Sequence, residues 1–71
     1  MILYIDIGNT NVVSAVWDGS KFYKKTRIDS YSNSDDIFVN LSSKTVKNVV
    51  ISSVVPDLAR EYVEKSKNNY S

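Results

Sequence analysis

Hydrophobic and polar residues alternate along this chain in blocks that predict a small α/β domain. Residues 1–7 read Met-Ile-Leu-Tyr-Ile-Asp-Ile, a continuous β-prone run typical of a strand covered on both faces. Residues 11–17 are again β-branched and aromatic, and residues 21–28 follow as a third strand after the hairpin signal Asp18-Gly19. The first part of the chain therefore predicts an antiparallel meander of three strands.

The rest of the chain predicts two helices and one further strand. Residues 34–41 begin with Ser34, a residue suited to cap a helix, and continue with two aspartates and apolar residues at helical spacing. Residues 49–51 read Val-Val-Ile, which favours a buried parallel strand, and Pro56 is placed near the first position of a second helix. The buried stripe predicted for that helix consists of Leu58, Ala59, Tyr62 and Val63.

The predicted order is strand, strand, strand, helix, strand, helix, which indicates a mixed sheet with helices on at least one face. A sheet of this kind in isolation leaves an edge and a face uncovered. Four large aromatic residues are expected in the core: Trp17, Phe22, Phe38 and Tyr62.

Composition narrows the possible chemistry. The chain has 71 residues, enough for one domain at most, and it contains no cysteine and no histidine, which excludes thiol chemistry and the usual zinc sites. A formal net charge of +1 gives no indication of a nucleic-acid partner. The apolar runs are far shorter than the roughly 20 residues that span a bilayer, and no secretory signal is recognisable, so we expect a cytoplasmic protein without a membrane partner.

Asp6 is the residue that points most directly to chemistry. It is the one charge in the first predicted strand, and it stands just before the turn Gly8-Asn9-Thr10-Asn11. A carboxylate on a rigid strand end can hold a hydrated Mg²⁺, while amides and short polar side chains in a glycine-bearing turn can bind phosphate oxygens. An edge-strand charge beside an ordinary hairpin turn is the alternative. The only glycines are Gly8 and Gly19, which excludes the Walker A and GxGxxG loops.

Three segments of the chain resemble one enzyme family. Residues 6–11, Asp-Ile-Gly-Asn-Thr-Asn, resemble the phosphate-1 motif DxGNTN at the amino terminus of type III pantothenate kinases, members of the superfamily of actin, Hsp70 and hexokinase. Trp17-Asp18-Gly19 together with Arg27-Ile28 is similar to the family's second hairpin, and residues 51–56 resemble its ISSVVP stretch. The segments occur in the family's order and cover nearly the whole chain.

The resemblance implies an α/β, ribonuclease H-like or actin-like mixed sheet in the order β-β-β-α-β-α, with residues 1–71 as the amino-terminal part of the first actin-like ATPase domain. It implies ATP-dependent phosphorylation of pantothenate to 4'-phosphopantothenate, the first step of coenzyme A synthesis. Mg²⁺, a monovalent cation (K⁺ or NH4⁺) and a homodimer belong to the same expectation.

The resemblance also implies a nucleotide-binding set. Asp6 would lie near the magnesium, Asn9 and Thr10 would contact phosphate oxygens, and the three apolar members would contribute backbone and shape. The full set is Asp6, Ile7, Gly8, Asn9, Thr10, Asn11, Val12 and Val13.

Other parts of the family pattern are not found in these residues. The GxDR segment, whose aspartate resembles a general base, and the second phosphate turn DxGTA do not occur after Ser53. We therefore expect no catalytic residue in this chain, a general base and the monovalent-cation site beyond Ser71, a truncated domain, and negligible turnover by the 71 residues alone.

Weaker candidates and other functions stay open. Ser52 and Ser53 either face a cleft or bond the turn that follows, and Arg27 either approaches a substrate or is solvated. One alternative function is a non-catalytic accessory or regulatory protein of the same fold. A small scaffold or dimerisation module is the other.

Overall fold

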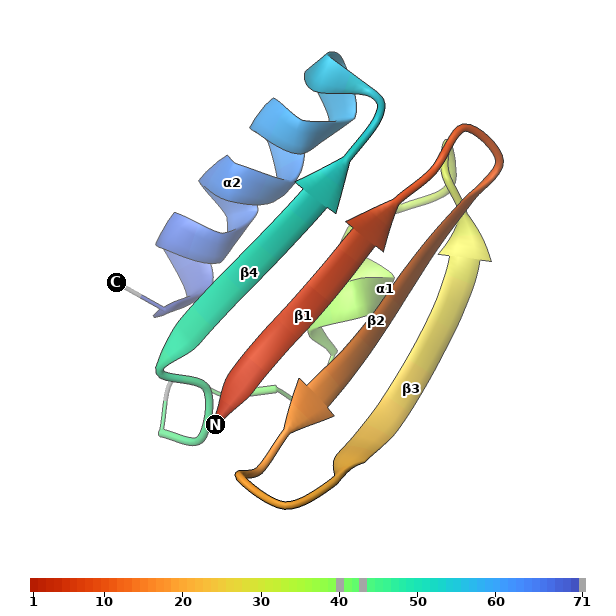
Figure 1. The fold of residues 1–71 in the computed structure, drawn as a ribbon. Helices are drawn as coiled ribbons and strands as arrows, with labels where there is room; N and C mark the ends of the chain where they lie inside the picture. The colour runs from red at the N-terminus through yellow and green to blue at the C-terminus, as the bar shows by residue number, and fades with distance from the viewer. Residues whose placement is uncertain (40, 43, 71) are drawn as a thin grey trace.

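The four strands form one mixed sheet in the order β3-β2-β1-β4 in the computed structural model, which describes residues 1–39, 41–42 and 44–70 (Figure 1). The first three strands are antiparallel neighbours, and the fourth lies parallel to the first. The predicted order of elements is thereby confirmed. The elements are β1 (Ile2–Ile7), β2 (Asn11–Trp17), β3 (Phe22–Asp29), α1 (Asp35–Phe38), β4 (Asn48–Ser53) and α2 (Pro56–Tyr70).

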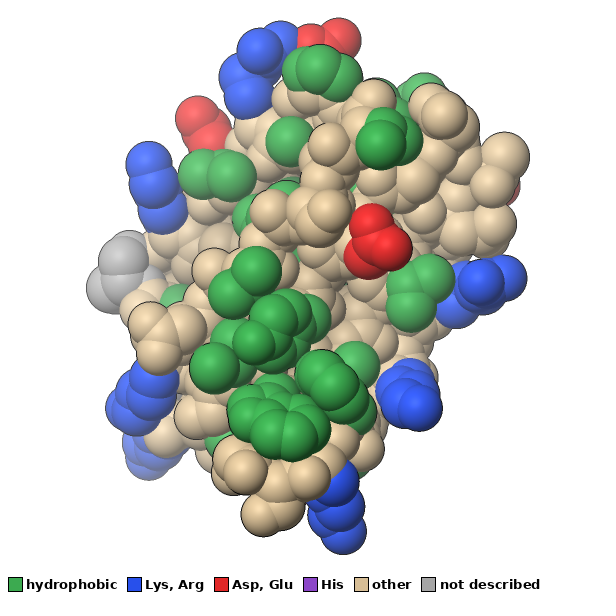
Figure 2. All heavy atoms as spheres, viewed as in Figure 1, with side chains coloured by type: hydrophobic (Ala, Val, Ile, Leu, Met, Phe, Trp, Pro, Cys, Tyr) green, Lys and Arg blue, Asp and Glu red, His purple; other side chains and the backbone are tan. Residues whose placement is uncertain are grey.

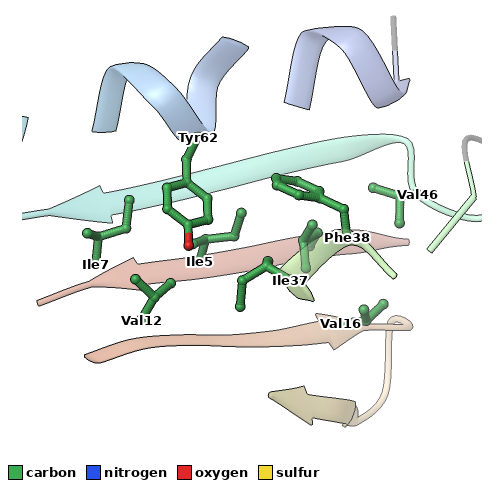
Figure 3. Close-up of a cluster of buried hydrophobic side chains, with 9 residues drawn as sticks. Ile5, Ile7, Val12, Val16, Ile37, Phe38, Val46 and Tyr62 are labelled. Atoms are coloured by element: carbon green, nitrogen blue, oxygen red, sulfur yellow. The ribbon is translucent and has the colours of Figure 1, made fainter. Parts of the chain in front are cut away.

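The core lies between the sheet and the two helices, which cover the same face of it (Figures 1 and 3). Tyr62 of α2 is fully buried, and Figure 3 shows its ring over β1, near Ile5 and Ile7. Phe38 of α1 packs on Tyr62 with a distance of 6.0 Å between ring centroids. Both aromatic residues were predicted in the core, and both are confirmed there. The buried cluster is Leu3, Ile5, Ile7, Val12, Val16, Ile37, Phe38, Val46 and Tyr62.

The opposite face of the sheet, called the outer face below, is not covered by any described residue. β1 alternates between buried and exposed positions, with Tyr4 and Asp6 exposed, because successive side chains of a strand point to opposite faces. The prediction that β1 is covered on both faces is therefore wrong for the described part, whereas the predicted open face is found. Figure 2, seen from the same side as Figure 1, shows hydrophobic side chains gathered over the strands.

Trp17 and Phe22 lie on this outer face, so their prediction as core residues is wrong. Phe22 is 47% exposed, and its ring contacts Trp17 and Tyr4 at centroid distances of 4.8 Å and 5.7 Å. Val16 is buried on the inner face, and strand alternation therefore turns Trp17 outward. Their aromatic side chains suggested burial, but their positions in the strands place them on the exposed face.

β4 is parallel to β1, as predicted, but it is not buried. It forms one edge of the sheet, and Val50 is exposed on the outer face. The stripe predicted on α2 is confirmed for Tyr62, which is buried, and for Leu58, which packs against the core, and Ala59 is half-buried. Val63 is exposed instead, and Ser66, four residues after Tyr62, is buried. No helix in the described part of the chain is long and apolar enough to cross a membrane.

Ser34 does not cap α1 through its side chain, which corrects another prediction. Its buried hydroxyl donates a hydrogen bond to the carboxylate of Glu61 in α2. Asn33 acts at the helix start instead, since its Oδ1 accepts a hydrogen bond from the N–H of Asp35 at 3.0 Å. A charged acceptor from a distant helix thus replaces the local backbone partner.

Candidate functional site

The carboxyl end of β1 brings the predicted site residues to one end of the sheet. The turn between β1 and β2 and the end of β4 lie together there, and the turn between β2 and β3 lies at the opposite end (Figure 1). Asp6 pairs in register with Val13 of β2 on one side and with Ser52 of β4 on the other. Because paired residues share a face, these three side chains form a row on the outer face.

Asp6 borders an open groove on this face. The groove has a volume of about 330 Å³ and is open to solvent. The Asp6 side chain is exposed, and no described residue donates a hydrogen bond to its carboxylate. The carboxylate is therefore accessible to an incoming cation. The groove is lined by Tyr4, Ile5, Asp6, Val13, Ser14, Ala15, Val50 and Ser52.

The turn between β1 and β2 is tight because Gly8 and Asn11 close it. The N–H of Gly8 donates to the carbonyl oxygen of Asn11 at 2.9 Å, leaving Asn9 and Thr10 at the tip. A Cβ atom built on Gly8 would lie 3.2 Å from that same oxygen. Gly8 thus favours the close backbone approach in this turn, and its φ is not in the left-handed region.

The tip of the turn leaves donors free. Among the described residues, no acceptor is hydrogen-bonded to the backbone N–H of Asn9 or Thr10, and both residues are exposed. The side-chain amide of Asn11 donates to the Thr10 hydroxyl at 3.0 Å. Free amides grouped at a turn are suited to bind an anion.

Three sequence candidates next to the turn have different surroundings. Ser52 lies beside Asp6 and lines the groove, whereas the Ser53 hydroxyl is bonded to the backbone of Val55, donating to its carbonyl and accepting from its N–H at 2.9 Å. For Ser53 the local structural role is thereby confirmed. Arg27 is exposed and pairs in register with Val13, which extends the outer-face row to β3.

Ile7 and Val12, two apolar members of the predicted nucleotide-binding set, point into the core. Both are buried and pair with each other in register, while Val13 is exposed on the outer face. Their side chains hold the ends of β1 and β2 together on the core side. Any contact of Ile7 or Val12 with a nucleotide would therefore involve their backbone.

Ser30 was missed in the sequence, although it touches the turn directly. Its hydroxyl donates to the carbonyl oxygen of Gly8 at 2.7 Å, and its N–H donates to that of Thr10 at 2.9 Å. Ser30 lies in a polar, turn-like segment 22 residues away from Gly8. Nothing in the sequence pattern distinguishes it from its serine neighbours.

A divalent cation would find one protein carboxylate here. No group of three or more acidic residues within residues 1–39, 41–42 and 44–70 is arranged to hold a metal ion. Mg²⁺ commonly takes one or two carboxylates and keeps waters and substrate phosphates as its other ligands. The accessible carboxylate of Asp6 next to free amides is compatible with this mode of Mg²⁺ binding. It is not compatible with a metal site in which the protein supplies all the ligands.

The sequence of this chain is similar to those of one protein family. The model of the family described as type III pantothenate kinase matches residues 2–71. A type III pantothenate kinase of Ehrlichia canis is 33% identical over 82 aligned positions, covering 100% of this chain and 31% of the relative. Type III pantothenate kinases of Listeria welshimeri and Listeria monocytogenes are each 35% identical, covering 82% of this chain and 27% of the relative. The chain thus spans less than a third of these relatives.

Proposed function

The chain belongs to the type III pantothenate kinase family, and from this premise we propose that its turn between β1 and β2 binds the phosphates of ATP for phosphoryl transfer to pantothenate. The product would be 4'-phosphopantothenate, the first intermediate on the way to coenzyme A. One observation carries the proposal. An accessible carboxylate, Asp6, stands directly beside a turn whose tip amides have no partner among the described residues.

The tip of the turn supplies donors for phosphate oxygens. The N–H groups of Asn9 and Thr10 carry partial positive charge, and the side chains of Asn9, Thr10 and Asn11 add further donors. Phosphoryl transfer depends mainly on positioning and charge stabilisation, so fixed donors at this place serve the reaction without covalent chemistry. Gly8 allows the turn to close tightly enough to present them.

Asp6 would hold Mg²⁺ through its carboxylate. The metal supplies neutralisation of phosphate charge when bound. Ser52, next to Asp6 in register, is placed to hydrogen-bond a water or phosphate oxygen in the same groove.

The remaining machinery is proposed to lie outside these 71 residues. The general base that accepts the proton of the pantothenate hydroxyl, the site for K⁺ or NH4⁺ and the homodimer contacts belong to that part. The proposed place of action is the cytoplasm, where coenzyme A synthesis would take place.

Replacing Asp6 tests the proposal. In the full-length protein, we expect Asp6→Asn to lower kcat/KM for phosphoryl transfer by about a hundredfold or more, because the amide lacks the charge that holds the metal. The rate of ADP formation with ATP and pantothenate measures this. Circular dichroism and the unfolding midpoint should stay close to wild type, since the side chain is exposed.

Asp18→Asn provides the matched control. It makes the same chemical change in the turn at the opposite end of β2, and its activity should equal that of wild type. Near-normal turnover by Asp6→Asn would contradict the assigned role. A full-length wild type that binds no MgATP would favour the accessory-protein alternative instead.

A further inference from the structure

Ser30 has both of its hydrogen-bond donors on the proposed nucleotide-binding turn. It follows directly after β3 and is 2% exposed. Its hydroxyl donates to the Gly8 carbonyl at 2.7 Å and its N–H to the Thr10 carbonyl at 2.9 Å. One buried residue from a different hairpin thus fixes two peptide groups of the turn.

Fixing a carbonyl also fixes the amide on the same peptide group. The peptide groups of the described residues are trans. A trans peptide group is planar, so its N–H points opposite to the C=O of the preceding residue. Because the Gly8 carbonyl points to Ser30, the N–H of Asn9 points away from it. The bond from the Ser30 N–H to the Thr10 carbonyl fixes the next peptide group of the turn, Thr10–Asn11, whose N–H points away from Ser30 toward the β1 side, where the Asn11 carbonyl accepts from Gly8.

We propose that Ser30 is a positioning residue for phosphate binding, which fixes the Gly8–Asn9 and Thr10–Asn11 peptide groups and so presents the N–H of Asn9 to the incoming nucleotide. The inference rests on the proposed function of the turn. Donors that are already oriented need no rearrangement when the phosphate arrives, whereas a free turn must order its peptide groups on binding. Burial of Ser30 keeps water from competing for the two carbonyls.

The first test measures ATP affinity in the full-length protein by isothermal titration calorimetry with MgATP. Ser30→Ala removes the hydroxyl donor and should weaken binding about tenfold. Ser30→Thr keeps a hydroxyl and should restore affinity to within about threefold of wild type. KM for pantothenate should stay unchanged in both variants, a split that general destabilisation would not produce.

Ser32→Ala is the matched control. The Ser32 hydroxyl donates to the carbonyl of Asp29 in the same loop and does not reach the turn. Its removal should leave ATP affinity at the wild-type value. If Ser30→Ala does not fold, Ser30→Cys takes its place, since it keeps the side-chain volume and offers only a weak donor. A folded Ser30→Ala or Ser30→Cys protein with wild-type ATP affinity would overturn the proposal.

The second test needs no nucleotide and therefore separates the two hypotheses. Labelling with ¹³C-carbonyl glycine and ¹⁵N-asparagine marks the Gly8–Asn9 peptide group, the one Gly-Asn pair among these 71 residues. Loss of the hydroxyl in Ser30→Ala should shift the Gly8 carbonyl and Asn9 amide resonances, and Ser32→Ala should not. Unshifted resonances would refute the orienting role of Ser30. If Ser30→Ala shifts these resonances but the wild-type protein does not bind MgATP, only the proposed function is refuted.

Discussion

The two hairpin turns at opposite ends of β2 use their hydrogen-bond donors in opposite ways. In the turn between β2 and β3, the Asp18 carboxylate accepts hydrogen bonds from the N–H groups of Ser20 and Lys21 at 2.8 Å and 2.9 Å. Gly19 adopts a φ of +104° there. This turn is closed by its own residues, since the N–H of Asp18 also donates to the carbonyl oxygen of Lys21 at 3.2 Å.

The turn between β1 and β2 is held from outside. Ser30 bonds the carbonyls on both sides of the tip, and the N–H groups of Asn9 and Thr10 have no acceptor among the described residues. A turn with a purely structural role satisfies its amides locally, whereas this one leaves them available and takes its rigidity from a neighbouring loop. The difference is the physical reason for assigning binding to one turn and not to the other.

Gly8→Ala should have the largest effect on this comparison. The added Cβ would lie 3.2 Å from the Asn11 carbonyl oxygen, so the turn must open by a few tenths of an ångström. We expect a loss of about 1–3 kcal/mol in the free energy of unfolding, measured by urea denaturation, and a clear weakening of MgATP binding. An unchanged ATP affinity would mean that the shape of this turn does not matter for the nucleotide.

Gly19→Ala should have a smaller effect, confined to stability. No atom lies within 4 Å of the added Cβ, so its cost comes from the positive φ of +104°, about 1–2 kcal/mol. ATP affinity should equal that of wild type, because this turn lies at the far end of the sheet. Weakened ATP binding by Gly19→Ala would erase the distinction between the two turns.

Asp18→Asn should have the smallest effect of the three turn variants, visible as a change in the pH dependence of stability. Hydrogen bonds from the N–H groups of Lys21 and Ser20 hold the pKa of Asp18 below its usual range. Its contribution to stability is therefore present above the unfolded-state pKa of about 3.9 and is lost as the pH falls through the lower folded-state pKa. Asp18→Asn cannot titrate, so its urea midpoint should fall less than that of wild type between about pH 6 and about pH 2.5. Equal falls in both proteins would contradict this role.

Burial raises the pKa of Tyr62 to about 12, with the carboxylates of Glu61 and Asp36 adding to the rise. Its hydroxyl is neutral at physiological pH and has no hydrogen-bond partner among the described residues. Tyr62→Phe, which removes that hydroxyl, should therefore be neutral or slightly stabilising in urea denaturation. A loss above about 1 kcal/mol would indicate a partner for the hydroxyl, such as a buried water.

The sequence alone determined the order of the elements, the parallel fourth strand and the placement of Asp6 before the Gly8 turn. These features depend on residue neighbours along the chain, through strand alternation, turn-forming residues and helix periodicity. The tertiary structure decided which face each strand buries, so that Phe22 is exposed while Tyr62 fills the core. It also decided which hydrogen-bond partner each serine hydroxyl has.

The Ser34 hydroxyl donates a hydrogen bond to the Glu61 carboxylate and does not cap its own helix. The Ser30 hydroxyl donates to the carbonyl oxygen of Gly8, 22 residues earlier in the chain. Both hydroxyls could equally have bonded nearby backbone, as isolated turn and cap residues do. Whether a serine hydroxyl bonds to a local or a distant partner depends on which polar groups are buried next to it when the chain packs. No local sequence pattern contains that information. The two hydrogen bonds from Ser30 to the turn could therefore be identified only in the folded structure.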